Sequence, residues 1–368
     1  MSALATTHGS ALILSGTAGE RGQAQAAGGD AALGEAVRAA TLARVEQART
    51  EGRITEPMRD YVAAQRRFAE SHDPHGMAEL RGIAEGFELD EEALFLHLHL
   101  GTLRDFGAGA AMSMAVDGCS AWATGDGPDG PLVVKNRDFS GTHLGVQRLM
   151  WHDGPDIATG GMFCLGSLGS PGAYSSGMNA AGLAVADTQI GARRHGIGWL
   201  RYFLMTRLLA NCANLGEALE FIRSVPHAGG GSLVMADSSG ATAAVELGCD
   251  KVAVSRDPLS WRTNHFLSPE LSAETLSHRG GRIDSNSESR LACLEATLPH
   301  REWDVAGAAR LMARHPADEH GAPICQHPED TDDTLTISSV IYAIRERCVY
   351  FHDGNPCAGR WLKIGLPA

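Results

Sequence analysis

The sequence lacks the features that mark membrane, secreted and nucleic-acid-binding proteins. Among its 368 residues there is no run of 18 apolar side chains, so no segment is predicted to span a bilayer. The start, MSALATTHGSALILSG, has no basic region and only a short apolar patch, so we predict no signal peptide and a cytoplasmic protein. Acidic residues outnumber lysine and arginine by 44 to 31, and the net charge of −13 argues against nucleic acid or a membrane surface as a partner.

Motifs for disulfides, metals and phosphates are also missing. The eight cysteines stand singly and form no CxxC pair, so we expect no disulfide framework. Neither His72/His75 nor Cys325/His327 has the spacing of a closed zinc site. The segment GGGSLVMAD lacks the Lys-Ser/Thr ending of a phosphate loop, and we place its Ser232 at the start of a strand near a substrate pocket. The sequence therefore predicts no metal and no cofactor.

The composition is that of a globular protein, with 43% hydrophobic residues and a length that allows one large domain or two smaller ones. The first hundred residues are rich in good helix formers, and Ala31–Ala48 and Pro57–Phe68 are predicted helices. Met77–Leu100 is predicted to form two helices separated by a turn, with Asp90 capping the second. The N-terminal third is therefore expected to be mostly helical.

Near residue 112 the pattern changes to short apolar segments around Gly/Pro/Asp turns. Ser120–Thr124 and Leu132–Arg137 flank GDGPDG and are predicted to form a hairpin. Further strands follow in blocks, with helices predicted at Ser287–Leu298 and Val305–Ala313. Hairpin-connected blocks favour a layered, antiparallel α+β architecture over a parallel doubly wound sheet.

Cys119 is the cysteine with the most suggestive context, because it follows Gly118 at the start of a predicted strand. Glycine allows strained backbone angles and a close approach of the thiol to the preceding carbonyl. If the Gly118–Cys119 bond is cut, the new α-amino group, with a pKa of about 7.7–8.0, can serve as the base for the thiol. On these residues alone, a buried structural thiol remains an alternative.

Segments spread along the chain resemble the penicillin acyltransferase-like family of N-terminal-nucleophile hydrolases, relatives of the bile-salt and penicillin V hydrolases. They occur in the family's order, and they are LSGTAGERGQAQ, ELRGIAEGFELDEEALFLHL, DGCSAWAT, VVKNRDF, RTNHF, SESR, TISSVIYAI and YFHDGNPC. The resemblance implies a four-layer αββα sandwich, made as a precursor and cut between Gly118 and Cys119. Residues 1–118 would stay bound as a smaller subunit beside 119–368, within one structural domain.

The same resemblance implies roles for five residues. Cys119 would be the autoproteolytic and catalytic nucleophile, and Asp138 would orient its α-amino group. Asn179 and Asn264 would hold the amine or donate to the oxyanion, and Arg290 would lie near the thiolate. Structural alternatives stay open for these four partners: a strand-end carboxylate, a hairpin-turn asparagine, a satisfied polar pair and a surface helix residue.

Two further residues are candidates for substrate binding. Ser289 precedes Arg290 and is a weaker candidate for the same pocket. Arg137 stands where the family often has tryptophan, and it would point away from Asp138 because neighbours on a strand face opposite sides. The departure suggests a different substrate preference.

The function implied is hydrolysis of a small N-acyl amide through an acyl-enzyme, or transfer of the acyl group to an amine. The expected partners are the small-molecule substrate and the chain's own N-terminal fragment, and a homo-oligomer is possible. Two other classes stay open: a silent homologue that binds an amide-bearing metabolite, and a non-enzymatic subunit whose acidic surface serves assembly.

Overall fold

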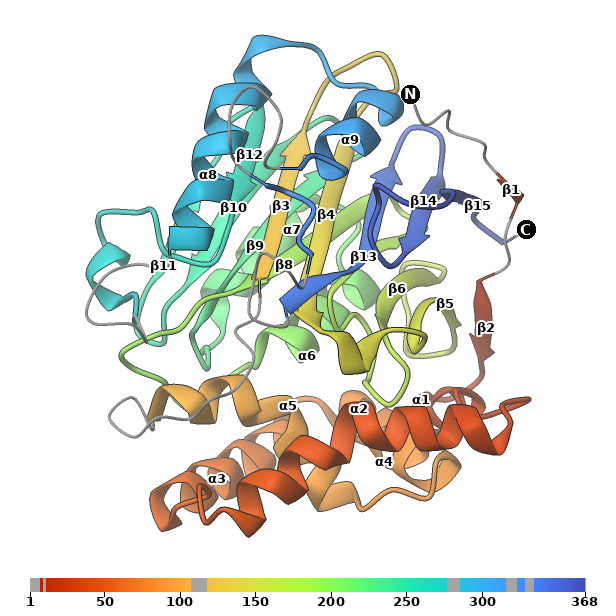
Figure 1. The fold of residues 1–368 in the computed structure, drawn as a ribbon, viewed down its shortest axis with the longest axis vertical. Coiled ribbons are helices and arrows are strands. Elements are labelled where there is room, and N and C mark those ends of the chain that lie inside the picture. Colours follow the sequence, from red (N-terminus) through yellow and green to blue (C-terminus); the bar gives the residue numbers. More distant parts are fainter. Residues whose placement is uncertain are drawn as a thin grey trace.

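The computed structural model describes residues 7–8, 11–106, 118–276, 285–315, 323–327 and 334–367. These residues form two mainly antiparallel β-sheets with helices on their outer sides (Figure 1). No helix in these ranges is long and apolar enough to cross a membrane.

The first sheet has seven strands and carries Cys119 near one of its edges. All its strand pairs are antiparallel except the pair of β1 and β15. In spatial order the strands are β1 (Thr7–His8), β15 (Leu362–Gly365), β14 (Cys348–Asp353), β13 (Thr334–Ala343), β4 (Leu132–Ser140), β3 (Gly118–Thr124) and β12 (Leu259–Arg262).

The second sheet has eight strands and includes one from the N-terminal segment. Its pairs are antiparallel except that of β2 and β5. In spatial order the strands are β11 (Val252–Ser255), β10 (Thr242–Leu247), β9 (Gly231–Asp237), β8 (Leu183–Gln189), β7 (Ser176–Asn179), β6 (Met162–Ser167), β5 (Gln147–Asp153) and β2 (Leu12–Ser15).

The helices divide into an N-terminal group, a central pair and a C-terminal pair. In Figure 1, α2 to α5 lie together below the sheets, and α8 and α9 lie in the upper part of the view. They are α1 (Ala18–Ala24), α2 (Ala31–Thr50), α3 (Glu56–His72), α4 (Pro74–Gly86), α5 (Glu91–Phe106), α6 (Arg201–Asn211), α7 (Leu215–Ser224), α8 (Ser285–Thr297) and α9 (Val305–Met312).

Among the described residues, alternating side chains of the strands build three large hydrophobic cores, which define four layers. On β3, Trp122 packs with α8 and α9, whereas Ala121 and Ala123 pack between the two sheets. The outer face of the second sheet packs against residues of α2 to α7. The order helix, sheet, sheet, helix confirms the predicted αββα sandwich.

The local predictions agree with the structure in most places. The hairpin around GDGPDG is present as β3 and β4, and Asp90 caps α5 by accepting a hydrogen bond from the Ala93 amide at 2.7 Å. The strand β12 ends at Arg262. Asn264 therefore lies just beyond a strand end, where its side chain can turn back toward β3.

A register irregularity in β13 lies opposite the site. Asp138 on β4 pairs with Thr336, but Arg137 pairs with Ser338, so Ile337 is the extra residue of a bulge. Because of the bulge, Thr336 and Ser338 lie on opposite faces of the sheet. Thr336 is on the same face as Asp138, and Ser338 is on the same face as Arg137.

Candidate active site

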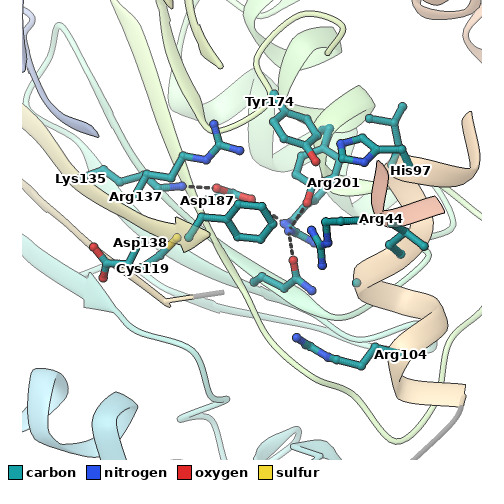
Figure 2. A pocket seen from close by; sticks show the side chains of 16 residues that line it. Arg44, His97, Arg104, Cys119, Lys135, Arg137, Asp138, Tyr174, Asp187 and Arg201 are labelled. Atoms are coloured by element: carbon teal, nitrogen blue, oxygen red, sulfur yellow. Dashed lines mark hydrogen bonds and ion pairs between the residues drawn. The ribbon is translucent and has the colours of Figure 1, made fainter. Parts of the chain in front are cut away.

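Cys119 is the second residue of β3 and lies at the end of the sheet that faces a pocket. Only 5% of its surface is exposed, and it pairs with Arg137 on β4. Its strand position gives its side chain the same orientation as Ala121 and Ala123, toward the space between the sheets. The thiol therefore reaches the pocket from within the sandwich, as Figure 2 shows.

The backbone of Cys119 is held on both sides by buried polar groups. Its amide donates to Asn264 Oδ1 at 2.8 Å, and its carbonyl oxygen accepts from Arg290 Nη1. Arg290 Nη2 also donates to Asn264 Oδ1 at 2.7 Å, and Asn264 Nδ2 donates to the Gln189 carbonyl at 2.8 Å. The structure thus brings three of the predicted residues together.

Arg290 is 1% exposed and packs on the helical side of the first sheet. Besides the Cys119 carbonyl it donates to Ser120 Oγ at 3.2 Å. The hydrogen bonds place its guanidinium on the backbone of Cys119. This contact is more specific than the proximity to the thiolate that the sequence suggested.

Asp138 is buried beside Gly118, with which it pairs across the hairpin. Its Oδ1 accepts from Thr336 Oγ1 at 2.6 Å, while its Oδ2 has no hydrogen-bond partner among the described residues. A Cβ on Gly118 would lie 3.2 Å from that Oδ2, so glycine is what allows the carboxylate to come this close to the backbone. Burial raises the pKa of Asp138, against the opposing effects of Arg290, Thr336 and Lys135.

The helix α8 presents Ser287 to the site and not Ser289. Ser287 Oγ accepts from the Asn264 amide at 2.8 Å and donates to Thr263 Oγ1 at 3.1 Å. Ser289 is exposed, which corrects its prediction as a pocket residue. The reason is helical phase: residue 287 is three before Arg290 and shares its face, whereas residue 289 does not.

Asn179 is not among the residues that line the Cys119 pocket. Its Nδ2 donates to the carbonyls of Leu209 and Cys212, and its Oδ1 accepts from the amides of Gly182 and Leu183. These bonds fix the β7–β8 turn against the end of α6. The predicted catalytic role is therefore corrected to a structural one.

Ser232 also lies outside the pocket lining. It is fully buried on β9 and shares a 2.7 Å hydrogen bond with Thr188 Oγ1 across the strand pair. The prediction that it binds substrate is corrected: its hydroxyl joins two strands.

Arg137 lines the pocket. Its Nη1 donates to Gln147 Oε1 at 2.8 Å and to Ser167 Oγ at 3.1 Å, and its guanidinium lies 5.0 Å from the centre of the Tyr174 ring. These contacts hold the charge in one position on the pocket wall.

Three charged residues that sequence reasoning missed form a network in the pocket. Asp187 on β8 pairs with Lys135 on β4 and, at 2.5 Å, with Arg201 on α6 (Figure 2). Burial opposes ionisation of Asp187, but the two cations lower the pKa of this carboxyl. The sequence does carry a signal for two of them: Lys135 in VVKN and Asp187 in LAVAD are charged residues within otherwise apolar strands.

The pocket carries an excess of positive charge. Its lining contains Arg44, Arg104, Lys135, Arg137 and Arg201 against the carboxylates Asp138 and Asp187. Burial lowers the pKa of His97 on the same wall to about 3, so this imidazole is neutral near pH 7. The space between the walls is about 560 Å³, part of it open to solvent.

Arg104 has a long ion pair in this pocket. Its Nε lies 3.7 Å from Asp105 Oδ1, and no hydrogen-bond partner for this buried nitrogen is present in the described ranges. Asp105 itself bonds more closely to His195 Nε2, at 2.9 Å. Figure 2 shows Arg104 reaching from α5 toward the side of the pocket where Cys119 lies.

Comparison with known proteins identifies one family. The sequence model of the acyl-coenzyme A:6-aminopenicillanic acid acyl-transferase family matches residues 122–358, a range that begins after Cys119. No curated protein is significantly similar in sequence.

Two solved structures are similar at low identity. A mutant of conjugated bile acid hydrolase from Clostridium perfringens has 11% identity and a TM-score of 0.40, over 68% of this chain and 99% of that chain. Penicillin V acylase from Agrobacterium tumefaciens has 12% identity and a TM-score of 0.36, over 67% of this chain and 86% of that chain.

Proposed function

The chain belongs to the acyl-coenzyme A:6-aminopenicillanic acid acyl-transferase family, and from this premise we propose that it is a self-processing amide hydrolase or acyltransferase. Cys119 is the nucleophile. The observation that carries the proposal is the arrangement around Cys119, whose amide and carbonyl are both held while its thiol lines a pocket. Such fixed geometry is what nucleophilic catalysis needs.

Maturation begins with attack of the Cys119 sulfur on the Gly118 carbonyl carbon. The C–N bond between these residues breaks, a thioester forms, and the thiol proton passes to the released Cys119 nitrogen. Water then hydrolyses the thioester to give the Gly118 carboxylate and the free thiol. Asp138 Oδ2, which has no hydrogen-bond partner among the described residues, supports this step, since it can accept a hydrogen bond from the new amine.

Turnover uses the same atoms on an external substrate. The α-amine takes the proton of the Cys119 thiol, and the thiolate attacks the amide carbonyl. One Nδ2 hydrogen of Asn264 bonds to the Gln189 carbonyl, which leaves the other for the oxyanion, a donor worth about 3–4 kcal/mol. The amine product leaves with the proton, and water or a second amine then takes the acyl group from sulfur.

The charge of the pocket supports an anionic substrate. Five cations face two carboxylates there, and a carboxylate on the substrate would offset the excess. The family is itself named for transfer to an acid, 6-aminopenicillanic acid. Arg104, whose buried Nε has no hydrogen-bond partner among the described residues, is the cation we assign to the substrate carboxylate.

The experiment compares N-acyl amino acids with the corresponding N-acyl amino acid amides, quantifying the released acid and amine. We expect kcat/KM to be about 10- to 100-fold higher for the carboxylates, the range of a charged hydrogen bond. Arg104→Met should remove most of this preference. Arg67→Met, an exposed arginine of α3, is the matched control and should leave it unchanged.

Cys119→Ala should be inactive on every substrate. If properly cleaved protein hydrolyses none of the panel and transfers no acyl group, the enzyme proposal fails, and a binding protein becomes the better account. If hydrolysis occurs without preference for carboxylates, only the substrate class is wrong.

A further inference from the structure

Four side chains with metal-binding atoms meet at the C-terminal end of α9, apart from the Cys119 pocket lining. They are His315, Cys325, His327 and Cys357, and their ligand atoms all lie within 4.8 Å of one another. Cys325 is buried, and the others are partly exposed. We propose that these four side chains bind one Zn²⁺ ion as a structural site.

The distances from His327 to the two sulfurs fit tetrahedral zinc. His327 Nε2 lies 3.6 Å from Cys325 Sγ and 3.4 Å from Cys357 Sγ. Zinc bonds of about 2.3 Å to sulfur and about 2.0 Å to nitrogen place the two ligand atoms about 3.5 Å apart in a tetrahedron. His327 therefore already has the separation from both sulfurs that a shared ion requires, and all four ligand atoms lie within 4.8 Å of one another.

The donor set specifies both the metal and its role. Two thiolates and two imidazoles are soft to borderline ligands that suit zinc. Four protein ligands fill the tetrahedron and leave no position for water, which is the pattern of structural and not catalytic sites. A Cys325–Cys357 disulfide would use the sulfurs but would not explain why two histidines converge on them.

Neighbouring groups hold the ligands in place. Asn355 Nδ2 lies 3.4 Å from Cys325 Sγ and donates to the Gln326 carbonyl at 2.6 Å. The Cys325 amide donates to the carbonyl of Arg314, next to His315, at 2.9 Å. Such bonds from surrounding groups orient metal ligands and stabilise a thiolate.

The site joins three parts of the chain that are far apart in sequence. His315 follows α9, Cys325 and His327 lie in the segment 323–327, and Cys357 follows β14. This explains why spacing did not reveal it: Cys325 and His327 form only half of the ligand set.

The same segment reaches the catalytic carboxylate. Gln326, between two ligands, exchanges hydrogen bonds with Thr336: its amide donates to Thr336 Oγ1 at 2.9 Å, and its carbonyl accepts from the Thr336 amide at 3.1 Å. Thr336 in turn donates to Asp138. Bound zinc would therefore help fix the support of Asp138 without touching substrate.

The test is the metal content of the full chain expressed with zinc and purified without chelator. We expect about one zinc per chain. Replacement by Co²⁺ should give the intense visible bands of tetrahedral cobalt together with thiolate-to-metal charge transfer, which a histidine-only surface site does not produce. Chelation should lower the Tm.

The matched variants are Cys325→Ser and Cys357→Ser, with Cys249→Ser as control because Cys249 is partly exposed and outside the group. The first two should lose the zinc and the control should keep it. The cobalt spectrum of the wild type decides the question even if a variant fails to fold. Wild-type protein without zinc and without the cobalt bands, or a Cys325–Cys357 disulfide in protein purified under reducing conditions, would overturn the proposal.

Discussion

At the scale of single residues, Asp138 is the group whose surroundings are hardest to explain by stability alone. It is buried, one oxygen lacks a partner within the described ranges, and burial raises its pKa. A buried carboxylate with an oxygen that accepts no hydrogen bond costs stability. Local conflicts of this kind are expected at functional sites.

Asp138→Asn keeps the shape of the side chain and an acceptor for Thr336, but it removes the charge. We expect self-cleavage to stop and amide turnover to fall about 100-fold or more. Because the folded pKa of Asp138 is above its unfolded value, its contribution to stability is lost as pH rises from about 4 through the folded pKa. Asparagine does not titrate, so the variant should not show this loss of stability as pH rises.

Urea unfolding at several pH values, cleavage followed on gels and an assay of amide turnover measure the three effects. A variant that cleaves and turns over like the wild type would contradict the role given to Asp138.

At the scale of elements, the sequence predicts many of the helices and strands correctly, but it predicts fewer of the contacts between them. The β3–β4 hairpin and the cap of α5 followed from local patterns. The pairing of Lys135 with Asp187 did not, because it joins two sheets whose stacking no local pattern specifies. Asn179 was misassigned because a turn asparagine and a catalytic one look alike in sequence.

The sequence of α8 allows one more inference, namely which of its residues share a face with Arg290. Once Arg290 is chosen, a 3.6-residue period places Asn286 and Ser287 on the same face and Ser289 off it. The structure agrees, since Asn286 Oδ1 accepts from Arg290 Nε at 2.8 Å.

Ser287→Ala and Ser289→Ala form a matched pair for this helix. Ser287→Ala removes the acceptor of the Asn264 amide, and we expect the free energy of unfolding to fall by about 1–2 kcal/mol, with slower self-cleavage. Ser289→Ala, on the exposed side, should change it by less than about 0.5 kcal/mol. Urea unfolding of both variants checks this, and equal effects would contradict the assigned helix face.

At the scale of the whole molecule, the N-terminal segment is built into the sandwich. Val37 and Leu80 from its helices belong to the same core as Val185 and Leu233 from the second sheet. Strand β2 also pairs with β5. A cut before Cys119 would break one peptide bond and leave this core intact.

We therefore expect residues 1–118 and 119–368 to remain one particle after cleavage. Size-exclusion chromatography in native buffer should give a single peak that resolves into two bands under denaturing electrophoresis. Separation of the fragments in native buffer would show that the two segments are not one structural domain.

The most direct test of the account is the intact mass of purified wild type beside Cys119→Ala. We predict that the 38.9 kDa wild-type chain splits into fragments of about one third and two thirds of that mass, the larger beginning at Cys119, and that the variant stays whole. A wild-type chain that remains whole, or a variant that is cut at the same bond, would contradict the claim that Cys119 is an N-terminal nucleophile.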